Sequence, residues 1–349
     1  MGKKIIVGIS IAAVLLCVLI SLFFINSKRE IIHKTSLNIS DRVLDFHIST
    51  NGIFLWDMEN LYILDKDGSF VKSIGVKNNP MEVFFASNFA YLYDSTLSRV
   101  YQYDENGQLI SNFKLDGNLY NVTYKNNNTI LHIKYDSKEC LFTLKSDGSL
   151  TQIYETSDVI LNYDVLDEKN FVVGDIKKGA NGFDNLVIIN RGGRVYDSIN
   201  YKSEIGLFFK MYKNKVVMVT DKNLYSLDKE NKISVEIPNI SDVLAIDNSI
   251  YLLHSNIITK YSKDLKETNK YILGANVSHM KNIVGSIYVY GDSDIGGEIG
   301  RFKEFYYRLP EAVEKIDING LKIGTLKNGK VDLYEIVNKR NISDKNENK

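Results

Sequence analysis

The stretch Leu61–Ile74, LYILDKDGSFVKSI, decides the fold. It consists of two short alternating apolar runs joined by Asp65-Lys66-Asp67-Gly68, which is typical of a β-hairpin. The pattern returns along the chain as RVYQYDENGQLISNF, CLFTLKSDGSLTQIY, NLVIINRGGRVYDSI, NLYSLDKENKISVEI and, more weakly, IITKYSKDLKETNKYI. The turn centres are separated by 39, 41, 45, 38 and 33 residues, at Gly68, Gly107, Gly148, Gly193, Asn231 and Asp264. Strands repeated at this period predict a β-propeller with one blade per repeat.

Two further markers keep the same phase as these hairpins. The first is a turn that contains Asn, whose tolerance of left-handed backbone suits tight hairpins, at Asn51-Gly52, Asn88, 126–128, Asn170, Asn214 and Asn248. The second is a polar residue just after the second strand of each repeat, at Asp57, Asp94, Asp136, Asp175, Asp221, His254 and Asp292. Three markers in one phase make a chance repeat improbable.

The number of blades depends on residues 295–318. These residues lack the usual turn, whereas Val277–Gly285 and Ile287–Asp292 have the pattern of the first two strands of a seventh blade. If residues 295–318 are an insertion, the last hairpin, LKIGTLKNGKVDLYEI, completes blade seven; if they are strands, it begins an eighth. We therefore predict an all-β propeller of about seven four-stranded blades, with eight possible. The segment Lys34–Ile39 is expected to pair with the last blade and close the ring.

The N-terminus contains a long apolar run, IIVGISIAAVLLCVLISLFFI, at residues 5–25. At about 1.5 Å per residue in a helix, these residues reach about 31 Å and would cross a hydrocarbon core of about 30 Å. The run is longer than the apolar part of a signal peptide and does not end in a small-x-small cleavage pattern. It favours an uncleaved signal anchor and a single-pass membrane protein, with the short N-terminus inside and the following domain extracytoplasmic.

The expected organisation has five parts. We assign a cytoplasmic N-terminus, a transmembrane anchor, a stalk that includes the possible ring-closing strand, the propeller and a polar, disordered tail, at residues 1–4, 5–25, 26–40, 41–338 and 339–349.

The charge balance argues against nucleic-acid binding, and the cysteine content argues against a disulfide within the domain. Lys plus Arg and Asp plus Glu number 43 each among 349 residues, and there is no basic stripe, so nucleic-acid binding has no electrostatic basis. Cys17 lies in the apolar run and Cys140 is alone, so no disulfide within the domain is expected.

One repeat resembles the NHL type. In SFVKSIGVKNNPMEVFFASNFAYLYDSTLSRVYQYDENGQLISNF, the NHL-like elements are Gly75, Pro80, Asp94, Arg99, Tyr103 and Asp104–Gly107. The match is partial over the neighbouring repeats and poor after Asp184. Among bacterial proteins, the resemblance is to membrane-anchored propellers, many of them without an assigned function. It implies a propeller with a binding surface and carries over no catalytic residue.

Three sets of residues are candidates for a functional site. The recurring aspartates could ring one face and bind a cation, but a residue that recurs once per blade more often caps its own turn. His47 with Asp45, together with His254 and His279, could approach the central channel, as polar residues do in propeller lactonases and lyases. The segment Ile176–Asp184 (IKKGANGFD) breaks the repeat, and its Lys177, Lys178 and Phe183 could contact a partner; a tolerated insertion is the plainer alternative.

These observations lead to one functional expectation and one alternative. The regular repeat contains no catalytic constellation, metal site or cofactor motif, which favours a membrane-anchored, extracytoplasmic, non-catalytic module that binds a protein or a cell-envelope polymer. The alternative is a metal-dependent, lactonase-like hydrolase or lyase working at the central channel. The fold alone identifies no ligand, because propellers host unrelated functions.

Overall fold

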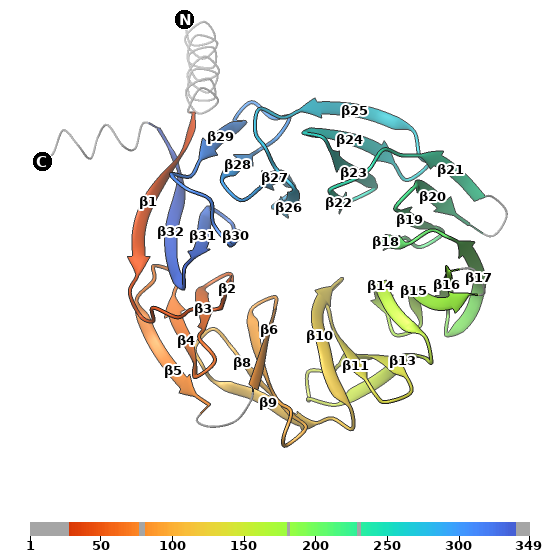
Figure 1. Cartoon of the computed structure of the whole chain (residues 1–349), viewed down its shortest axis with the longest axis horizontal. Helices are drawn as coiled ribbons and strands as arrows, with labels where there is room; N and C mark the ends of the chain where they lie inside the picture. The colour runs from red at the N-terminus through yellow and green to blue at the C-terminus, as the bar shows by residue number, and fades with distance from the viewer. Residues whose placement is uncertain (1–27, 77–80, 180–181, 229–231, 340–349) are drawn as a thin grey trace, which may run out of the picture.

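The computed structural model describes residues 28–76, 81–179, 182–228 and 232–339. These residues form eight four-stranded antiparallel sheets arranged as blades around a central axis (Figure 1). The structure therefore has the larger of the two expected blade counts. Residues 295–318 supply strands to blade 7 and the first strand of blade 8, and are not an insertion.

The first four blades follow one another along the chain. Their strands are β2 (Asp45–Ile48), β3 (Gly52–Trp56), β4 (Asn60–Asp65) and β5 (Phe70–Gly75); β6 (Met81–Ala86), β7 (Phe89–Asp94), β8 (Arg99–Tyr103) and β9 (Leu109–Lys114); β10 (Asn118–Lys125), β11 (Asn128–Lys134), β12 (Glu139–Leu144) and β13 (Leu150–Thr156); and β14 (Val159–Asp167), β15 (Asn170–Gly179), β16 (Gly182–Arg191) and β17 (Arg194–Lys202).

The next three blades have the same order, and the eighth takes its outermost strand from the N-terminus. Their strands are β18 (Gly206–Met211), β19 (Val216–Thr220), β20 (Asn223–Leu227) and β21 (Lys232–Glu236); β22 (Asp242–Ile246), β23 (Ser249–His254), β24 (Ile257–Ser262) and β25 (Glu267–Ile272); β26 (His279–Ile283), β27 (Ser286–Tyr290), β28 (Asp294–Gly297) and β29 (Phe305–Arg308); and β30 (Lys315–Asn319), β31 (Lys322–Lys327), β32 (Lys330–Asn338) and β1 (Arg29–Leu37).

Strand β1 closes the ring. It pairs with β32 from Arg29 opposite Asn338 to Leu37 opposite Val331, so it begins earlier than the expected Lys34–Ile39 segment. The third-to-fourth-strand turn of blade 1 packs against it. Gly68 in that turn has a φ of 89°, and a Cβ there would lie 2.7 Å from the side chain of Leu37. Closure thus covers the sheet edge that β32 would otherwise expose.

Burial within a blade follows the strand order. The second strands are almost wholly buried, as in GIFLW (β3) and VVMVT (β19), because both of their faces pack between neighbouring blades. The fourth strands, such as β5 and β25, are largely exposed. The Asp turns that revealed the repeat are Asx turns: Asp65 Oδ1 accepts bonds from the N–H groups of Asp67 and Ser69.

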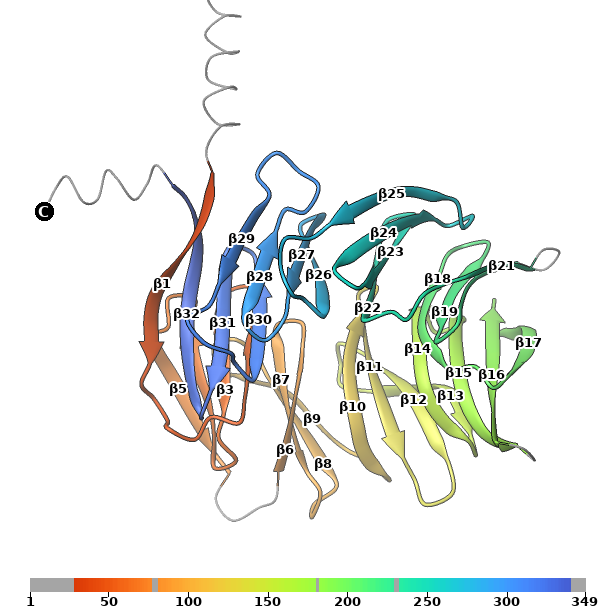
Figure 2. The same ribbon diagram turned by 45° about the horizontal axis from the view of Figure 1, so that its top comes forward.

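The two faces of the ring carry different turns, and both ends of the described chain lie on one of them. Because consecutive strands are antiparallel, the innermost strands all begin on one face, which we call the entry face and which also carries the turns between second and third strands. The opposite, terminal face carries the other turns and both ends of the described chain, where the N–H of Lys339 donates to the carbonyl of Lys28 at 2.9 Å. Figure 2 shows β1 beginning at the same end of the molecule as the β28–β29 loop.

No helix among these residues is long and apolar enough to span a bilayer, and the apolar run at 5–25 lies outside them.

Candidate functional site

The innermost strands of blades 7, 8 and 1 join through a row of charged side chains. Lys281 Nζ on β26 lies 2.6 Å from Asp317 Oδ1 on β30, and Asp317 Oδ2 lies 2.9 Å from His47 Nδ1 on β2. Asp317 Oδ2 also accepts the backbone N–H of Ile48 at 2.8 Å. Burial alone would raise the pKa of Asp317, but the His47 hydrogen bond and the charge of Lys281 hold that pKa far below its usual range. Asp317 is therefore an ionised link between three blades.

His47 has no ring nitrogen left for catalysis. Its Nε2 lies 2.8 Å from the carbonyl oxygen of Ser87 in blade 2, and its ring stacks on Phe85. Both ring nitrogens therefore face acceptor oxygens of the protein, one from a carbonyl and one from a carboxylate. Asp45, which the sequence grouped with His47 as a candidate channel residue, pairs with Lys315 of blade 8, whose Nζ also donates to the carbonyl of Phe46 at 2.9 Å.

Two more aspartates clasp neighbouring blades on their innermost strands. Asp164 Oδ2 accepts the N–H of Met211 at 2.8 Å, and Asp242 Oδ2 accepts the N–H of Met280 at 2.6 Å. Together with the bond from Ile48 to Asp317, these contacts tie blade 4 to blade 5, blade 6 to blade 7 and blade 8 to blade 1. The inner wall of the ring is thus held by structural carboxylates.

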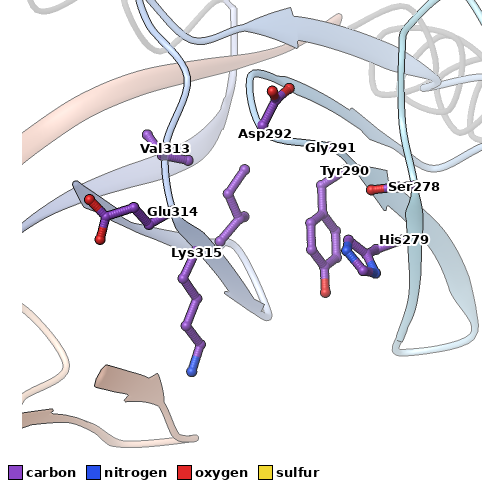
Figure 3. Close-up of a pocket in the computed structure, with 9 residues that line it drawn as sticks. Ser278, His279, Tyr290, Gly291, Asp292, Val313, Glu314 and Lys315 are labelled. Atoms are coloured by element: carbon purple, nitrogen blue, oxygen red, sulfur yellow. The ribbon is translucent and has the colours of Figure 1, made fainter. Parts of the chain in front are cut away.

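Next to this row, a pocket of about 330 Å³ opens on the entry face between blades 7 and 8. Figure 3 shows Tyr290 and His279 side by side on one wall and Val313, Glu314 and Lys315 on the other, with Asp292 above them. Burial, with the nearby charges of Asp317 and Asp242, raises the pKa of Tyr290 to about 12, so its hydroxyl stays protonated. The ammonium group of Lys315 on the wall is engaged by Asp45 and by the carbonyl of Phe46. The remaining polar groups are a hydroxyl, an imidazole and two carboxylates, a set suited to hydrogen-bonding a donor-rich or cationic group.

The rest of the entry face carries exposed apolar side chains. They come from the starts of innermost strands, from turns after second strands and from the end of one outer strand, and they are Leu44, Met58, Leu97, Tyr120, Val159, Leu161, Leu207 and Ile272. They belong to blades 1 to 6, and so run around the ring from one side of the pocket toward the other. We call this set the apolar crescent.

The predicted contact segment of blade 4 is also on the entry face. It does not form an insertion loop: β15 and β16 continue as a paired hairpin, with Lys177 opposite Asp184 and Lys178 opposite Phe183. Both lysines are exposed and Phe183 is half-buried. Val159, a residue of the apolar crescent and the first of β14, pairs with Ile176. The hairpin after Ile176 therefore extends beyond the start of β14, next to the apolar crescent.

The three candidate histidines do not form one site. His47 and His279 lie on innermost strands on either side of blade 8, whereas His254 ends β23, a second strand, and bonds Thr259 Oγ1 at 2.9 Å. Of the three, His279 is the one that lines the pocket, with its ring 5.2 Å from that of Tyr290.

Two of the recurring aspartates cap their own turns: Asp57 Oδ1 accepts the N–H groups of Glu59 and Asn60, and Asp94 Oδ1 accepts that of Leu97. Asp221 Oδ1 instead accepts the N–H of Ile205, just before the neighbouring strand β18, and Asp175 accepts the hydroxyl of Tyr154. Within the described part of the chain, no three His, Cys, Asp or Glu side chains are grouped so that they could hold a metal ion.

Sequence reasoning missed Lys281, Lys315 and Asp317. Lys315 and Asp317 begin a strand in the region whose pattern is weakest, and their partners are at the other end of the chain. The sequence does contain one clue. The segments KID at 315–317 and DFHI at 45–48 both place ionisable residues at the beginning of an innermost strand.

No protein-family model and no curated protein matches the chain. Among solved structures, the chain is similar to BamB from Moraxella catarrhalis, with 9% identity, a TM-score of 0.54 and coverage of 88% of this chain and 98% of that chain. Sqt1 from Saccharomyces cerevisiae has 11% identity, a TM-score of 0.56 and coverage of 90% and 99%. The computationally designed Ika8 protein has 12% identity, a TM-score of 0.58 and coverage of 87% and 99%. At these identities the likeness shows a β-propeller fold and nothing finer.

Proposed function

We propose that this protein is a membrane-anchored, extracytoplasmic β-propeller that binds another protein at its entry face without catalysing a reaction. The observation that carries the proposal is the separation of the two faces. The apolar crescent and the polar pocket lie on the entry face, whereas both ends of the described chain lie on the terminal face.

The anchor is supported by sequence and by the position of β1. Residues 5–25 are uncharged and long enough to cross a bilayer, and Arg29 begins β1 on the terminal face. A membrane attached through these residues is on the side of the terminal face, and the entry face points away from it. The NHL-like repeat, whose Pro80 lies outside the described residues, adds a resemblance to membrane-anchored bacterial propellers.

The chemistry of the entry face favours a protein over an envelope polymer. Exposed apolar side chains around most of the ring suit the apolar core of a protein interface, whereas a polysaccharide would be met by a more continuous polar surface. The pocket beside His279 would accept a cationic or amide side chain of the partner between Asp292 and Glu314. Lys177 and Lys178 on the blade 4 hairpin could contact acidic groups at the rim.

Site-specific photocrosslinking tests this proposal. A photoreactive residue replaces Leu161 on the entry face of the full-length protein in its native membrane, and a second variant carries it at Val195, which is exposed at the start of β17 near the terminal face. We expect a discrete protein adduct from position 161 and none from position 195. The partner, identified from the adduct and purified, should lose affinity for Leu161→Asp and keep it for Val195→Asp. Adducts of equal yield at the two positions, or none at either, would overturn the proposal.

A further inference from the structure

Among the described turns between first and second strands, which lie on the terminal face, only those of blades 7 and 8 carry a large exposed apolar side chain. The other exposed apolar side chains at this end lie at the starts of outer strands and include Phe70, Leu109, Val195 and Ile233. In blades 1, 2, 3 and 6, the turns between first and second strands consist of polar residues such as Thr50-Asn51, Ser87-Asn88, Asn126-Asn127 and Asp247-Asn248. In blades 7 and 8 the corresponding turns present Val284, which is 94% exposed, and Leu321, which is also exposed. Blade 7 adds Phe302 in the β28–β29 loop, and Phe302 is 96% exposed. Large apolar side chains this exposed indicate a contact surface when they gather.

The loop that carries Phe302 is firmly built. The N–H of Arg301 donates to the carbonyl of Glu298 at 3.0 Å, and the N–H of Glu304 donates to the carbonyl of Arg301 at 3.1 Å. Gly300, with a φ of 73°, packs so closely on Tyr271 that a Cβ would lie 2.2 Å from the ring. Arg301 Nη2 also donates to the carbonyl of Gly285 at 2.6 Å, which joins this loop to the Val284 turn. The exposed Phe302 is therefore held in place by an ordered loop.

This loop is bonded to the point where the N-terminal segment enters the propeller. Arg29, the first residue of β1, donates from Nε to Glu298 Oε1 at 3.0 Å. Arg29 follows Ile25, the end of the apolar run, by only four positions, so even a fully extended chain puts Arg29 within about 14 Å of that end. A bilayer spanned by residues 5–25 must then lie very close to the Phe302 loop.

The charges of the loop suit an anionic lipid surface. Glu298 is neutralised by Arg29, and Glu304 accepts the N–H of Gly300 and the hydroxyl of Tyr306 within the loop. Lys303 stands beside Phe302 and forms no ion pair among the described residues. An aromatic ring flanked by a lysine is the composition of an interfacial membrane contact, where the ring enters the headgroup region and the ammonium meets lipid phosphates.

We propose that Phe302, Val284 and Leu321 form a lipid-contacting rim that rests on the membrane beside the anchor. This inference rests on the anchor in the function proposed above. The rim is a second attachment point next to the first, so it restricts rotation about the short stalk. It holds the ring with its entry face directed away from the bilayer.

Tryptophan fluorescence in vesicles tests the rim. The chain has one native tryptophan, Trp56, which is buried, so the spectrum of the unmodified protein can be subtracted. Phe302→Trp is introduced into the full-length protein, reconstituted in vesicles of phosphatidylcholine and phosphatidylglycerol with and without brominated acyl chains. Met58→Trp, on the exposed β3–β4 turn of the entry face, is the matched control.

We expect the added emission of the Phe302→Trp variant to shift to the blue and to lose most of its intensity with brominated lipids, while the indole of the Met58→Trp variant emits as in water under both conditions. Leu321→Trp should behave like Phe302→Trp if the rim extends to blade 8. Protein that floats with the vesicles but leaves the indole at position 302 unquenched overturns the rim and leaves the anchor standing. Protein that does not float overturns the anchor and the rim together. Neither outcome depends on the entry-face partner, which the crosslinking experiment tests separately.

Discussion

His47 Nδ1 lies 2.9 Å from Asp317 Oδ2, and this contact joins the first blade of the ring to the last. Asp317 also holds Lys281 of blade 7 and the backbone of blade 1, so one buried carboxylate links three consecutive blades. A propeller whose ends are joined in this way is closed by side chains at its inner wall and by strand β1 at its outer wall. The two closures make separate predictions.

Replacing Asp317 by Asn should weaken the inner closure. The amide keeps the shape of the side chain but leaves the ammonium group of Lys281 without its counter-ion and the His47 ring without its charged acceptor. Breaking a buried ion pair on one side typically costs about 3–5 kcal/mol of unfolding free energy, which urea denaturation would measure. Asp332→Asn, which changes a side chain on β32 that is 38% exposed, is the control and should change stability by no more than about 1 kcal/mol.

The stabilisation from Asp317 also has a defined pH dependence. Because the folded-state pKa lies below the ordinary value of 3.8, the carboxylate stabilises the fold above that pH and loses its contribution as the pH falls below it. The Asp317→Asn variant should therefore show a shallower loss of stability in acid than the unmodified protein. Equal slopes for the two proteins would contradict the assigned role of Asp317.

Removing β1 tests the outer closure. A protein that begins at residue 40 lacks β1 and exposes the edge of β32, whereas one that begins at residue 29 keeps the whole strand. We expect the shorter protein to unfold at a lower temperature and to self-associate in size-exclusion chromatography, because an unpaired edge recruits other strands. The longer protein should remain monodisperse. Two proteins with the same melting temperature and elution volume would show that β1 is dispensable for the ring.

Asp175 should contribute a pH dependence of stability opposite in sign to that of Asp317. Its carboxyl is buried on β15, the second strand of blade 4, accepts the hydroxyl of Tyr154 and has one oxygen without a hydrogen-bond partner among the described residues. Burial raises its pKa from 3.8 to about 6, so the folded protein binds this proton more tightly than the unfolded chain and gains stability as the pH falls from about 6 to 4. The ionised form costs about 3 kcal/mol at neutral pH, at about 1.4 kcal/mol per pKa unit.

Asp175→Asn should therefore raise the unfolding free energy at pH 7 and flatten its pH dependence between pH 4 and 6. Equilibrium unfolding across this range measures both effects. Asp167→Asn, which changes an exposed turn carboxylate of the same blade, should leave the pH profile as it is. A profile that Asp175→Asn does not alter would show that Asp175 is ionised in the folded protein at little cost.

The sequence predicted the propeller because the hairpin turns repeat local chemistry. Asp65 and Asp104 accept the same pattern of backbone bonds in blades 1 and 2, so the same residues recur at the same phase. The hairpin pattern is not recognisable in the sequence of blade 7, because the third strand of this blade, β28, is short and ends in two glycines. A Cβ at Gly297 would lie 2.4 Å from Phe305, so packing required a residue with low strand propensity there.

The candidate site was harder to predict because it depends on ring closure. Lys281, Asp317 and His47 meet only when the innermost strand of blade 8 lies between those of blades 7 and 1, and no local pattern relates them. The exposed Phe302 and the apolar crescent were also out of reach, since an apolar residue in a strand repeat is expected in the core. Their exposure follows from the three-dimensional position of turns and strand ends.

The most direct test of the account is whether the entry face is displayed outside the membrane. Met58→Cys places a thiol on the exposed β3–β4 turn, and native Cys140 is buried. Cells that produce the full-length variant are treated with a membrane-impermeant maleimide before or after the membranes are opened. We predict the same labelling of position 58 in intact and opened cells, with the unmodified protein as the background. Labelling of position 58 only after the membranes are opened would contradict the account.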